Sequence, residues 1–292
     1  MRFLHRLLSF GLAPIPRSFP RCAACGEGIF GDCLTALDRT WHPTHFRCGV
    51  CNKPLERRFS VSHHQEPFCS SHDQGKVLCQ CCGHLVTGKT SVNGLCHGCE
   101  GDILRDVREA ESLLGGVQSQ LRKEGLPWWP QSFPVRLVGP EDMKIHDHQG
   151  SSALVGLIEK VTSLDSGGRQ LRRIPQIRLL RGRPRLVQGS VIAHELGHAW
   201  LFQKGVHNLP GDLEEGFCEF CAHHWLSRTG DRRAPYLMRR IETNPDATYG
   251  GGFRKISALA GKDGLSGLVG QIGSLSKPAL GGGVIPSIKV GR

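Results

Sequence analysis

The sequence predicts an α+β fold in which small zinc-stabilised modules precede a larger domain of helices and short strands. All but two of the thirteen cysteines lie between residues 22 and 99, and most form C-x-x-C or H-x-x-C pairs at the spacing of zinc ligands. Beyond residue 100, one long stretch has apolar residues at helical spacing, and several short apolar runs are separated by Gly, Asp and Ser. A chain of 292 residues is long enough for two such units.

The composition is that of an ordinary globular protein, with 39% apolar and 22% charged residues. No apolar run approaches the ~18 residues that a transmembrane helix requires, so we do not expect a membrane-spanning protein. The net charge of +11 would suit a nucleic acid or an acidic partner. However, the arginines between Arg172 and Arg185 lack interleaved aromatic residues, so a basic surface is the plainer interpretation and nucleic-acid binding the weaker one.

The two ends of the chain are predicted to be disordered. Residues 1–21 contain four arginines and no acid, as a mitochondrial targeting peptide does, but Arg6 and three prolines interrupt the apolar stretch. We therefore expect a disordered lead-in. Residues 276–292 include three consecutive glycines and a basic tip, and are predicted to be a disordered tail.

Residues 22–73 contain eight potential zinc ligands, spaced as two groups of four. The first predicted site consists of Cys22, Cys25, His42 and His45. The second consists of Cys48, Cys51, Cys69 and His72. With Trp41 before the first histidine and Phe46 between the groups, the series resembles a LIM domain, which implies a protein-binding module. His45 stands where LIM domains usually have Cys, but imidazole also binds zinc.

Residues 79–99 carry a further four-cysteine pattern, typical of a zinc ribbon or of half a LIM domain. The predicted ligands are Cys79, Cys82, Cys96 and Cys99. Three neighbours could substitute for one of them, namely Cys81, His84 and His97. Cys33 and Cys81 are otherwise expected to be small buried apolar residues. A site closed by four ligands has no open position, so these metals stabilise folds rather than catalyse.

The remaining secondary structure follows from apolar spacing. Residues 101–124 are predicted to be a linking helix, because apolar residues from Ile103 to Leu121 recur at helical spacing before Gly125. Three short apolar runs, at 135–138, 153–158 and 174–180, are predicted strands. We assign them to one larger domain, residues 125–275.

The stretch from Leu186 to Gly205 contains an H-E-x-x-H motif in a predicted helix that Gly205 ends. His194 and His198 are four residues apart, so both imidazoles can reach one metal ion, with Glu195 beside them. Apolar residues surround the motif, which indicates a buried helix, and two buried histidines without a partner would be costly. The motif therefore favours zinc over a solvated helix.

A second buried helix is predicted to begin near Asp212 and to supply the third ligand. We assign Glu215 as that ligand and Glu219, one turn on, as a carboxylate that orients a ligating histidine. Glu214 is the substitute if the helix register differs. Alternatively, these acids simply favour the start of a helix. Cys218 and Cys221 are expected to be small buried residues rather than ligands.

The chain resembles the DA-one family of ubiquitin-activated LIM-domain zinc metallopeptidases, known from plant growth control. Beside the LIM series and the four-cysteine unit, the resemblance rests on the motifs His-Glu-Leu-Gly-His-Ala-Trp, Glu-Glu-Gly-Phe-Cys and Ala-His-His-Trp-Leu. It spans about Cys22 to Leu275. The second helix also resembles the ligand helix of gluzincin peptidases, which favours Glu215 over Glu214. A zincin-like fold is therefore expected for the larger domain.

The resemblance implies hydrolysis of peptide bonds at a catalytic zinc held by His194, His198 and Glu215, with Glu195 as the general base. Three structural zinc ions would bring the total to about four per chain. The implied partners are protein substrates recruited through the LIM region, and ubiquitin or ubiquitinated proteins. Family members carry ubiquitin-interacting helices ahead of the LIM domain; the 21 residues here are too few, so we do not expect ubiquitin binding through that element.

Some features of the expected active site remain open. The candidates for a hydrogen-bond donor to the transition state are Tyr249, His223, His224 and His207. Tyr249 is placed in a glycine-rich loop suited to folding over a cleft, with a Tyr packed in a core as the equal alternative. Strand 174–180 is expected to be the sheet edge that pairs with an extended substrate. Zinc-binding thiols suit a reducing compartment, so we expect a cytoplasmic or also nuclear protein. The alternative function is a catalytically inert LIM adaptor, against which the intact Glu195 argues.

Overall fold

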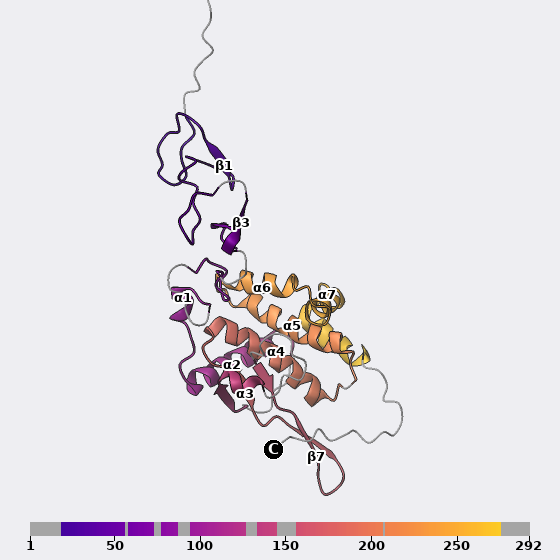
Figure 1. Cartoon of the computed structure of the whole chain (residues 1–292). Coiled ribbons are helices and arrows are strands. Elements are labelled where there is room, and N and C mark those ends of the chain that lie inside the picture. Colours follow the sequence, from indigo (N-terminus) through magenta and orange to yellow (C-terminus); the bar gives the residue numbers. More distant parts are fainter. Residues whose placement is uncertain are drawn as a thin grey trace, which may run out of the picture. The chain divides into compact units, whose positions relative to one another are not determined.

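The computed structural model describes residues 19–55, 58–72, 77–86, 94–126, 133–144, 156–206 and 208–275 (Figure 1). The chain divides into two compact units. The first contains the chain up to Leu78 and His84–Gly88, and the second contains Cys79–Gly83 and the chain from Lys89. Both predicted disordered ends, apart from residues 19–21, lie outside the described residues, as does His207. No helix in the described ranges is both long and apolar enough to cross a membrane.

The first unit contains two short antiparallel hairpins and one turn of 3-10 helix. Its elements are β1 (Leu34–Ala36), β2 (Arg39–Trp41), β3 (Phe59–Val61), β4 (Pro67–Cys69) and η1 (Ser70–His72). Leu37 and Asp38 both have positive φ, which is the backbone of a two-residue hairpin turn between β1 and β2. Hairpins this short are unstable alone in water. They depend on the metal sites and on one small buried cluster.

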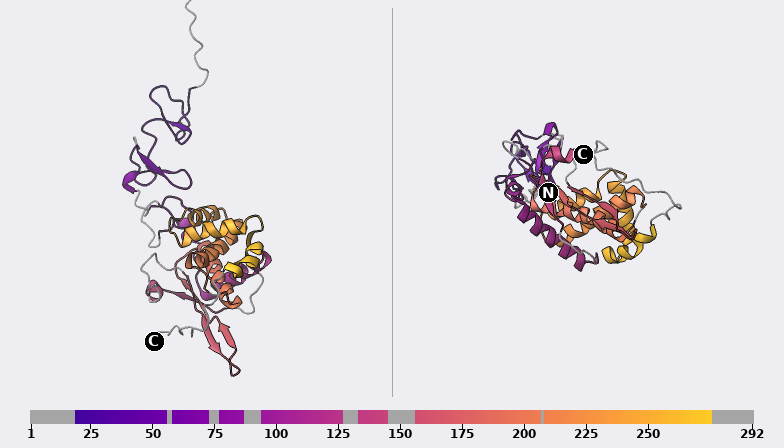
Figure 2. Two further views of the ribbon diagram at one scale, coloured as in Figure 1. Left: turned by 90° about the vertical axis from the view of Figure 1, so that its right-hand side faces the viewer. Right: turned by 90° about the horizontal axis from the view of Figure 1, so that it is seen from below.

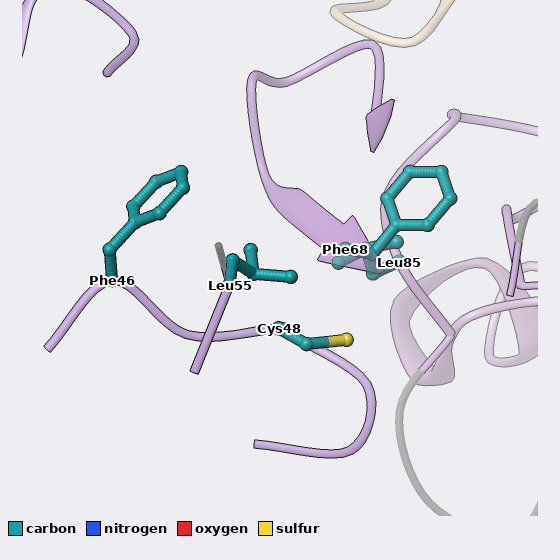
Figure 3. Close-up of a cluster of buried hydrophobic side chains, with 5 residues drawn as sticks. All are labelled: Phe46, Cys48, Leu55, Phe68 and Leu85. Carbon is teal, nitrogen blue, oxygen red and sulfur yellow. The ribbon is translucent and has the colours of Figure 1, made fainter. Parts of the chain in front are cut away.

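That cluster is drawn in Figure 3 and combines residues from four separate stretches of the first unit. Its members are Phe46, Cys48, Leu55, Phe68 and Leu85. A carboxylate fixes Leu85 in place, because Glu66 accepts hydrogen bonds from the Leu85 backbone N–H at 2.9 Å and from Ser62 Oγ at 2.7 Å. Phe46, predicted as the residue between the two ligand groups, is fully buried in this core.

The second unit contains all the longer helices. Those before the metal-binding motif are α1 (His97–Glu100), α2 (Val107–Lys123) and α3 (Pro140–Lys144). Those from the motif onwards are α4 (Arg185–Lys204), α5 (Gly211–Arg228), α6 (Ala234–Glu242), α7 (Tyr249–Ala260), α8 (Gly264–Ile272) and the 3-10 turn η2 (Gly273–Leu275). The unit therefore combines helices with the small sheets described below, which makes the chain α+β.

Helix α2 is shorter than the predicted helix and is not merely a link. It begins at Val107 rather than at residue 101, because Asp106 caps it by accepting a hydrogen bond from the Glu109 backbone N–H. Its apolar face is buried against α4, α5 and the sheet. Helix α2 thus belongs to the core of the second unit.

The strands of the second unit form a three-stranded sheet and a separate two-stranded ribbon. They are β5 (Val135–Val138), β6 (Gly156–Ile158), β7 (Val161–Leu164), β8 (Gln170–Arg173) and β9 (Ile177–Leu180). The sheet has the order β5-β9-β6, with β9 parallel to β5 and antiparallel to β6. The prediction that strand 174–180 is a sheet edge was therefore wrong. Ile177 and Leu179 are fully buried, as is usual for a central strand.

Strands β6 to β9 make one long hairpin that is interrupted near its middle. Residues 159–160 join β6 to β7 and residues 174–176 join β8 to β9, so one strand carries an extra residue, a β-bulge. Across the bulge, the Glu159 backbone N–H donates to Gln176 O at 3.1 Å. The inner half of the hairpin lies in the sheet, and the outer half, Val161–Arg173, projects from the second unit (Figures 1 and 2). We call this outer half the arm.

Close packing of α4, α5 and α7 depends on glycines at their contacts. A Cβ at Gly189 of α4 would lie 2.1 Å from Trp225 of α5, and one at Gly216 of α5 would lie 2.3 Å from the backbone of Gly252 in α7. Helix α4 ends where predicted, at Gly205, whose φ of 71° is the left-handed conformation that favours glycine. The three helices consequently meet around one end of the H-E-x-x-H motif.

Candidate metal centre

Two histidines of α4 and one glutamate of α5 converge on a common point. His194 and His198 lie one turn apart on α4, and their Nε2 atoms are 3.3 and 3.6 Å from the same Oε2 atom of Glu215. Zinc bonds of 2.0–2.1 Å at tetrahedral angles would separate two ligand atoms by about 3.3 Å. Both nitrogen–oxygen distances therefore suit ligands of one zinc ion.

Two further carboxylates hold the outer nitrogens of the same imidazoles. Nδ1 of His194 is 3.3 Å from Glu219 Oε1, and Nδ1 of His198 is 3.0 Å from Glu214 Oε1. Because a carboxylate only accepts, each Nδ1–H donates. Each Nε2 also faces a carboxylate, that of Glu215, and must lose its proton to bind a metal ion. Glu214, considered above as a substitute ligand, thus contacts the side of His198 that faces away from the shared point.

The cluster is strongly acidic. Burial alone would lower the pKa of His194, but hydrogen bonds with Glu215 and Glu219 outweigh it and raise that pKa well above its ordinary value. Burial would likewise raise the pKa of Glu215, yet the two imidazoles lower it. With Glu195 included, four carboxylates surround two imidazoles. A divalent cation would offset this excess of negative charge, so the donor set fits a metal ion.

Cys218 is a second donor near the imidazoles. Its Sγ lies within 4.8 Å of one nitrogen of His194 and of His198. The side chain is fully buried beneath Gly197, where burial raises the thiol pKa well above its ordinary value. Zinc binds the thiolate form, whereas Glu215 is ionised and places an oxygen toward both Nε2 atoms. Glu215 is therefore the better third ligand.

Glu195 lies beside the shared point and against the sheet. Its side chain is 7% exposed, and a Cβ at Gly156 in β6 would lie 3.1 Å from Glu195 Oε1. The same Cβ would lie 2.2 Å from Val191 Cγ1, so only a residue without a side chain allows β6 to pass so close to α4. Gly156 of β6, the outer strand in the described part of the sheet, thus lies close to Glu195.

Among the three candidate donors that the structure describes, Tyr249 is the one placed at the cluster. Its ring centroid is 6.5 Å from that of His194. Burial and the charges of Glu215 and Glu219 raise its pKa to about 12, so the phenol keeps its proton. The other two described candidates are engaged elsewhere: His223 contacts Glu242 and His224 contacts Glu124.

Tyr249 is not in a loop, as predicted, but is the first residue of α7. The glycine-rich sequence after it misled the prediction. Asp246 Oδ1 accepts hydrogen bonds from the backbone N–H groups of Thr248 and Tyr249, which starts the helix. The glycines then serve the close contact with α5 rather than flexibility, and that contact brings Tyr249 to His194.

The three predicted structural sites are each assembled as clusters of zinc-binding side chains. Within each predicted set, the ligand atoms lie within 4.8 Å of one another. In the first unit, backbone N–H groups donate to Cys48 Sγ from Val50 and Cys69, both at 3.4 Å. Burial alone would raise the pKa of the Cys48 thiol, but the hydrogen bonds outweigh it and lower the pKa to about 6, which favours the thiolate that zinc binds.

Of the two cysteines that were expected to be buried without metal, only one is. Cys81 is fully buried, whereas Cys33 is exposed, so that prediction was wrong for Cys33. Cys33 follows a glycine and an aspartate in an irregular segment that contains no buried residue between Phe30 and Cys33, and a single thiol does not create a core.

The four-cysteine site belongs to the second unit rather than to a separate module. Arg233, just before α6, reaches Cys99 Sγ at 3.9 Å and Asp102 at 2.8 Å. Gln80 accepts hydrogen bonds from Arg183 through its side chain and from Arg240 through its backbone. Arg183, Arg233 and Arg240 therefore serve contacts within this unit.

Comparisons with known proteins agree with this division. A LIM domain model matches residues 22–77, and a DA1-like model, described as Protein DA1, matches residues 145–234. Protein DA1 of Arabidopsis thaliana is 26% identical over 81% of this chain, and Protein DA1-related 1 of the same plant is 25% identical over 86%. The LIM domain-containing protein HDR3 of Oryza sativa subsp. japonica is 21% identical over 85%.

The chain covers 64% of Protein DA1 and 65% of Protein DA1-related 1. The matched LIM region includes all eight predicted LIM ligands, and the matched DA1-like region includes His194, His198 and Glu215. The chain therefore contains a LIM domain followed by a DA1-like domain, and it is homologous over most of its length to the plant DA1 and DA1-related proteins.

Proposed function

We propose that the chain is a zinc metalloendopeptidase that cleaves protein substrates recruited through its LIM region. The observation that carries this proposal is the position of Glu215 Oε2 between the Nε2 atoms of His194 and His198. Three protein ligands leave a tetrahedral metal one position for water or substrate, whereas the four-ligand sites of this chain are closed. The α4–α5 centre is thus the one suited to catalysis.

When bound, zinc would lower the pKa of a water molecule and polarise the carbonyl of the scissile bond. Glu195 would accept the proton of the attacking water and pass it to the leaving amine nitrogen. Its burial beside Gly156 limits competing contacts with solvent. Tyr249, which stays protonated, would donate a hydrogen bond to the developing negative charge on the carbonyl oxygen.

An extended substrate would pair with the free edge of β6. This replaces the predicted role of strand 174–180, which is central in the sheet. An edge strand offers unpaired backbone donors and acceptors to a peptide, and β6 offers them next to Glu195. Zinc-binding thiols suit a reducing compartment, so we propose residence in the cytoplasm or also the nucleus. Ubiquitinated proteins remain proposed partners.

The test replaces Glu195 with Gln. This change keeps the size and the hydrogen-bonding capacity of the side chain but removes the base, so zinc content and folding should be retained while cleavage is lost. A cell lysate is incubated with each zinc-loaded protein, and new peptide termini are identified by mass spectrometry. Termini that require Glu195 support the proposal; identical termini with both proteins would leave only the alternative, a LIM adaptor without catalytic activity.

A further inference from the structure

The arm exposes apolar side chains of the kind that binding surfaces carry. Its two strands pair only with each other among the described residues, and every residue from Val161 to Leu171 is exposed. Three of these are large and apolar: Val161, Leu164 and Leu171, with exposed fractions of 40%, 67% and 43%. A two-stranded ribbon is only marginally stable in water by itself, so apolar side chains on it are costly unless they serve binding.

The two faces of the arm differ. Arg173 is paired with Val161, and Leu171 with Ser163, so these four residues share one face. Arg172 is on the opposite face, where its guanidinium covers the end of α4 at Gly205. The face with Val161, Leu171 and Arg173 therefore points away from α4, and all three residues are exposed.

The charge of the arm is positive. Three arginines lie in the arm and one lysine directly precedes it: Arg169, Arg172, Arg173 and Lys160. Against them stands Asp165, whose carboxylate accepts hydrogen bonds from the backbone N–H groups of Gly167 and Arg169 in the turn. Glu159, just before the arm, is paired with Arg178 at 2.6 Å. A ligand on the arm thus meets cations beside apolar side chains.

The arm is also continuous with the proposed active site. Strand β7 extends β6, whose Gly156 lies close to Glu195, and Lys160 between them lies 3.6 Å from Glu214, the carboxylate that holds His198. A peptide that follows the edge of β6 away from Glu195 runs onto the edge of β7. Resting on the proposed function, we infer that the arm binds an extended acidic segment of the substrate to one side of the cleaved bond.

The test measures affinity first, so that it does not depend on turnover. The zinc-loaded E195Q protein is titrated with fluorescent peptides of about 12 residues, long enough to follow β6 and β7. One peptide has Glu at alternate positions, and its counterparts have Gln or Lys there. We expect the Glu peptide to bind about five- to tenfold more tightly than the Gln peptide, with a preference that weakens as salt rises.

Two double variants decide where the preference arises. R169E/R173E should abolish or reverse it, while R105E/R108E, which makes the same charge change at two exposed arginines, one just before α2 and one in its first turn, should leave it intact. Lys160 is not altered because it contacts Glu214. Equal affinity for the three peptides, or a preference that R169E/R173E leaves unchanged, would overturn the inference.

Other outcomes distinguish this inference from membrane binding by the arm and from failure of the proposed peptidase function. If arm-dependent binding to vesicles of phosphatidylserine and phosphatidylcholine occurs without any difference among the peptides, the arm binds membranes and the inference is wrong. Cleavage of the Glu peptide is then scored separately with wild-type and E195Q protein. Equal product from both would defeat the proposed peptidase, whereas Glu195-dependent cleavage without acid preference would defeat only the role of the arm.

Discussion

The crossing of α5 and α7 gives the sharpest prediction about stability. A Cβ at Gly252 would lie 2.0 Å from Asp212 O and 3.0 Å from Gly216 Cα, both backbone atoms that cannot rotate away. At the neighbouring Gly251, the nearest atom is Asp246 O at an ordinary 3.6 Å. The substitutions G252A and G251A therefore make the same chemical change on the same helix, one against backbone and one at ordinary van der Waals distance.

The expected magnitudes differ in sign. Alanine improves helix propensity by up to about 1 kcal/mol at either position. In G252A, α7 must shift by about 1 Å, and overpacking of this kind costs about 1–3 kcal/mol. We therefore expect G252A to be about 2 kcal/mol less stable than wild type and G251A to be equally or slightly more stable. For a unit of this size, 1 kcal/mol changes Tm by about 2–4 °C.

Differential scanning calorimetry of the zinc-loaded protein measures both variants. The transition of the second unit should fall by about 4–8 °C in G252A and should not fall in G251A. The same shift of α7 moves Tyr249, three residues away, relative to His194. Equal Tm values for the two variants would show that the helices do not cross as described, and the placement of Tyr249 would lose its support.

Two further predictions concern the residues around the metal centre. E214Q and E219Q should each weaken zinc binding at this centre about 10–100-fold, because each removes the carboxylate that holds an Nδ1–H group. Competition with a chelator measures the zinc affinity. The control is E242Q, which alters the pair with His223 and should leave the zinc affinity unchanged. Unchanged affinity in both variants would remove the positioning role. Y249F should retain zinc and Tm but lower kcat about 10²–10³-fold, since it removes only the phenol donor; an unaltered kcat would exclude Tyr249 as that donor.

The ligand sets could be predicted from sequence because local geometry fixes them. Residues four apart on a helix share a face, which placed His194 and His198 together, and two-residue gaps between cysteines allow a tight turn around one ion. Glu215 was reachable because it begins the next buried helix. Glu214 was harder, since its contact with His198 rather than with the metal depends on the rotation of α5 relative to α4.

Features that depend on tertiary contacts could not be predicted. The apolar run of β9 looks the same at a sheet edge and at its centre, and only the pairing with both β5 and β6 distinguishes them. The glycines after Tyr249 resemble a loop, although they permit a close helix contact. Nothing local to Lys160 indicates its contact with Glu214, because the two are joined only by the fold.

The central claim is that one metal ion is held by two imidazoles of α4 and one carboxylate of α5. X-ray diffraction from crystals of zinc-loaded protein, recorded on both sides of the zinc absorption edge, locates each zinc ion directly. We predict about four anomalous peaks per chain, one of them within ~2.2 Å of His194 Nε2, His198 Nε2 and a Glu215 oxygen. Three peaks with none between α4 and α5, or a peak there bound by Cys218 without Glu215, would contradict the account.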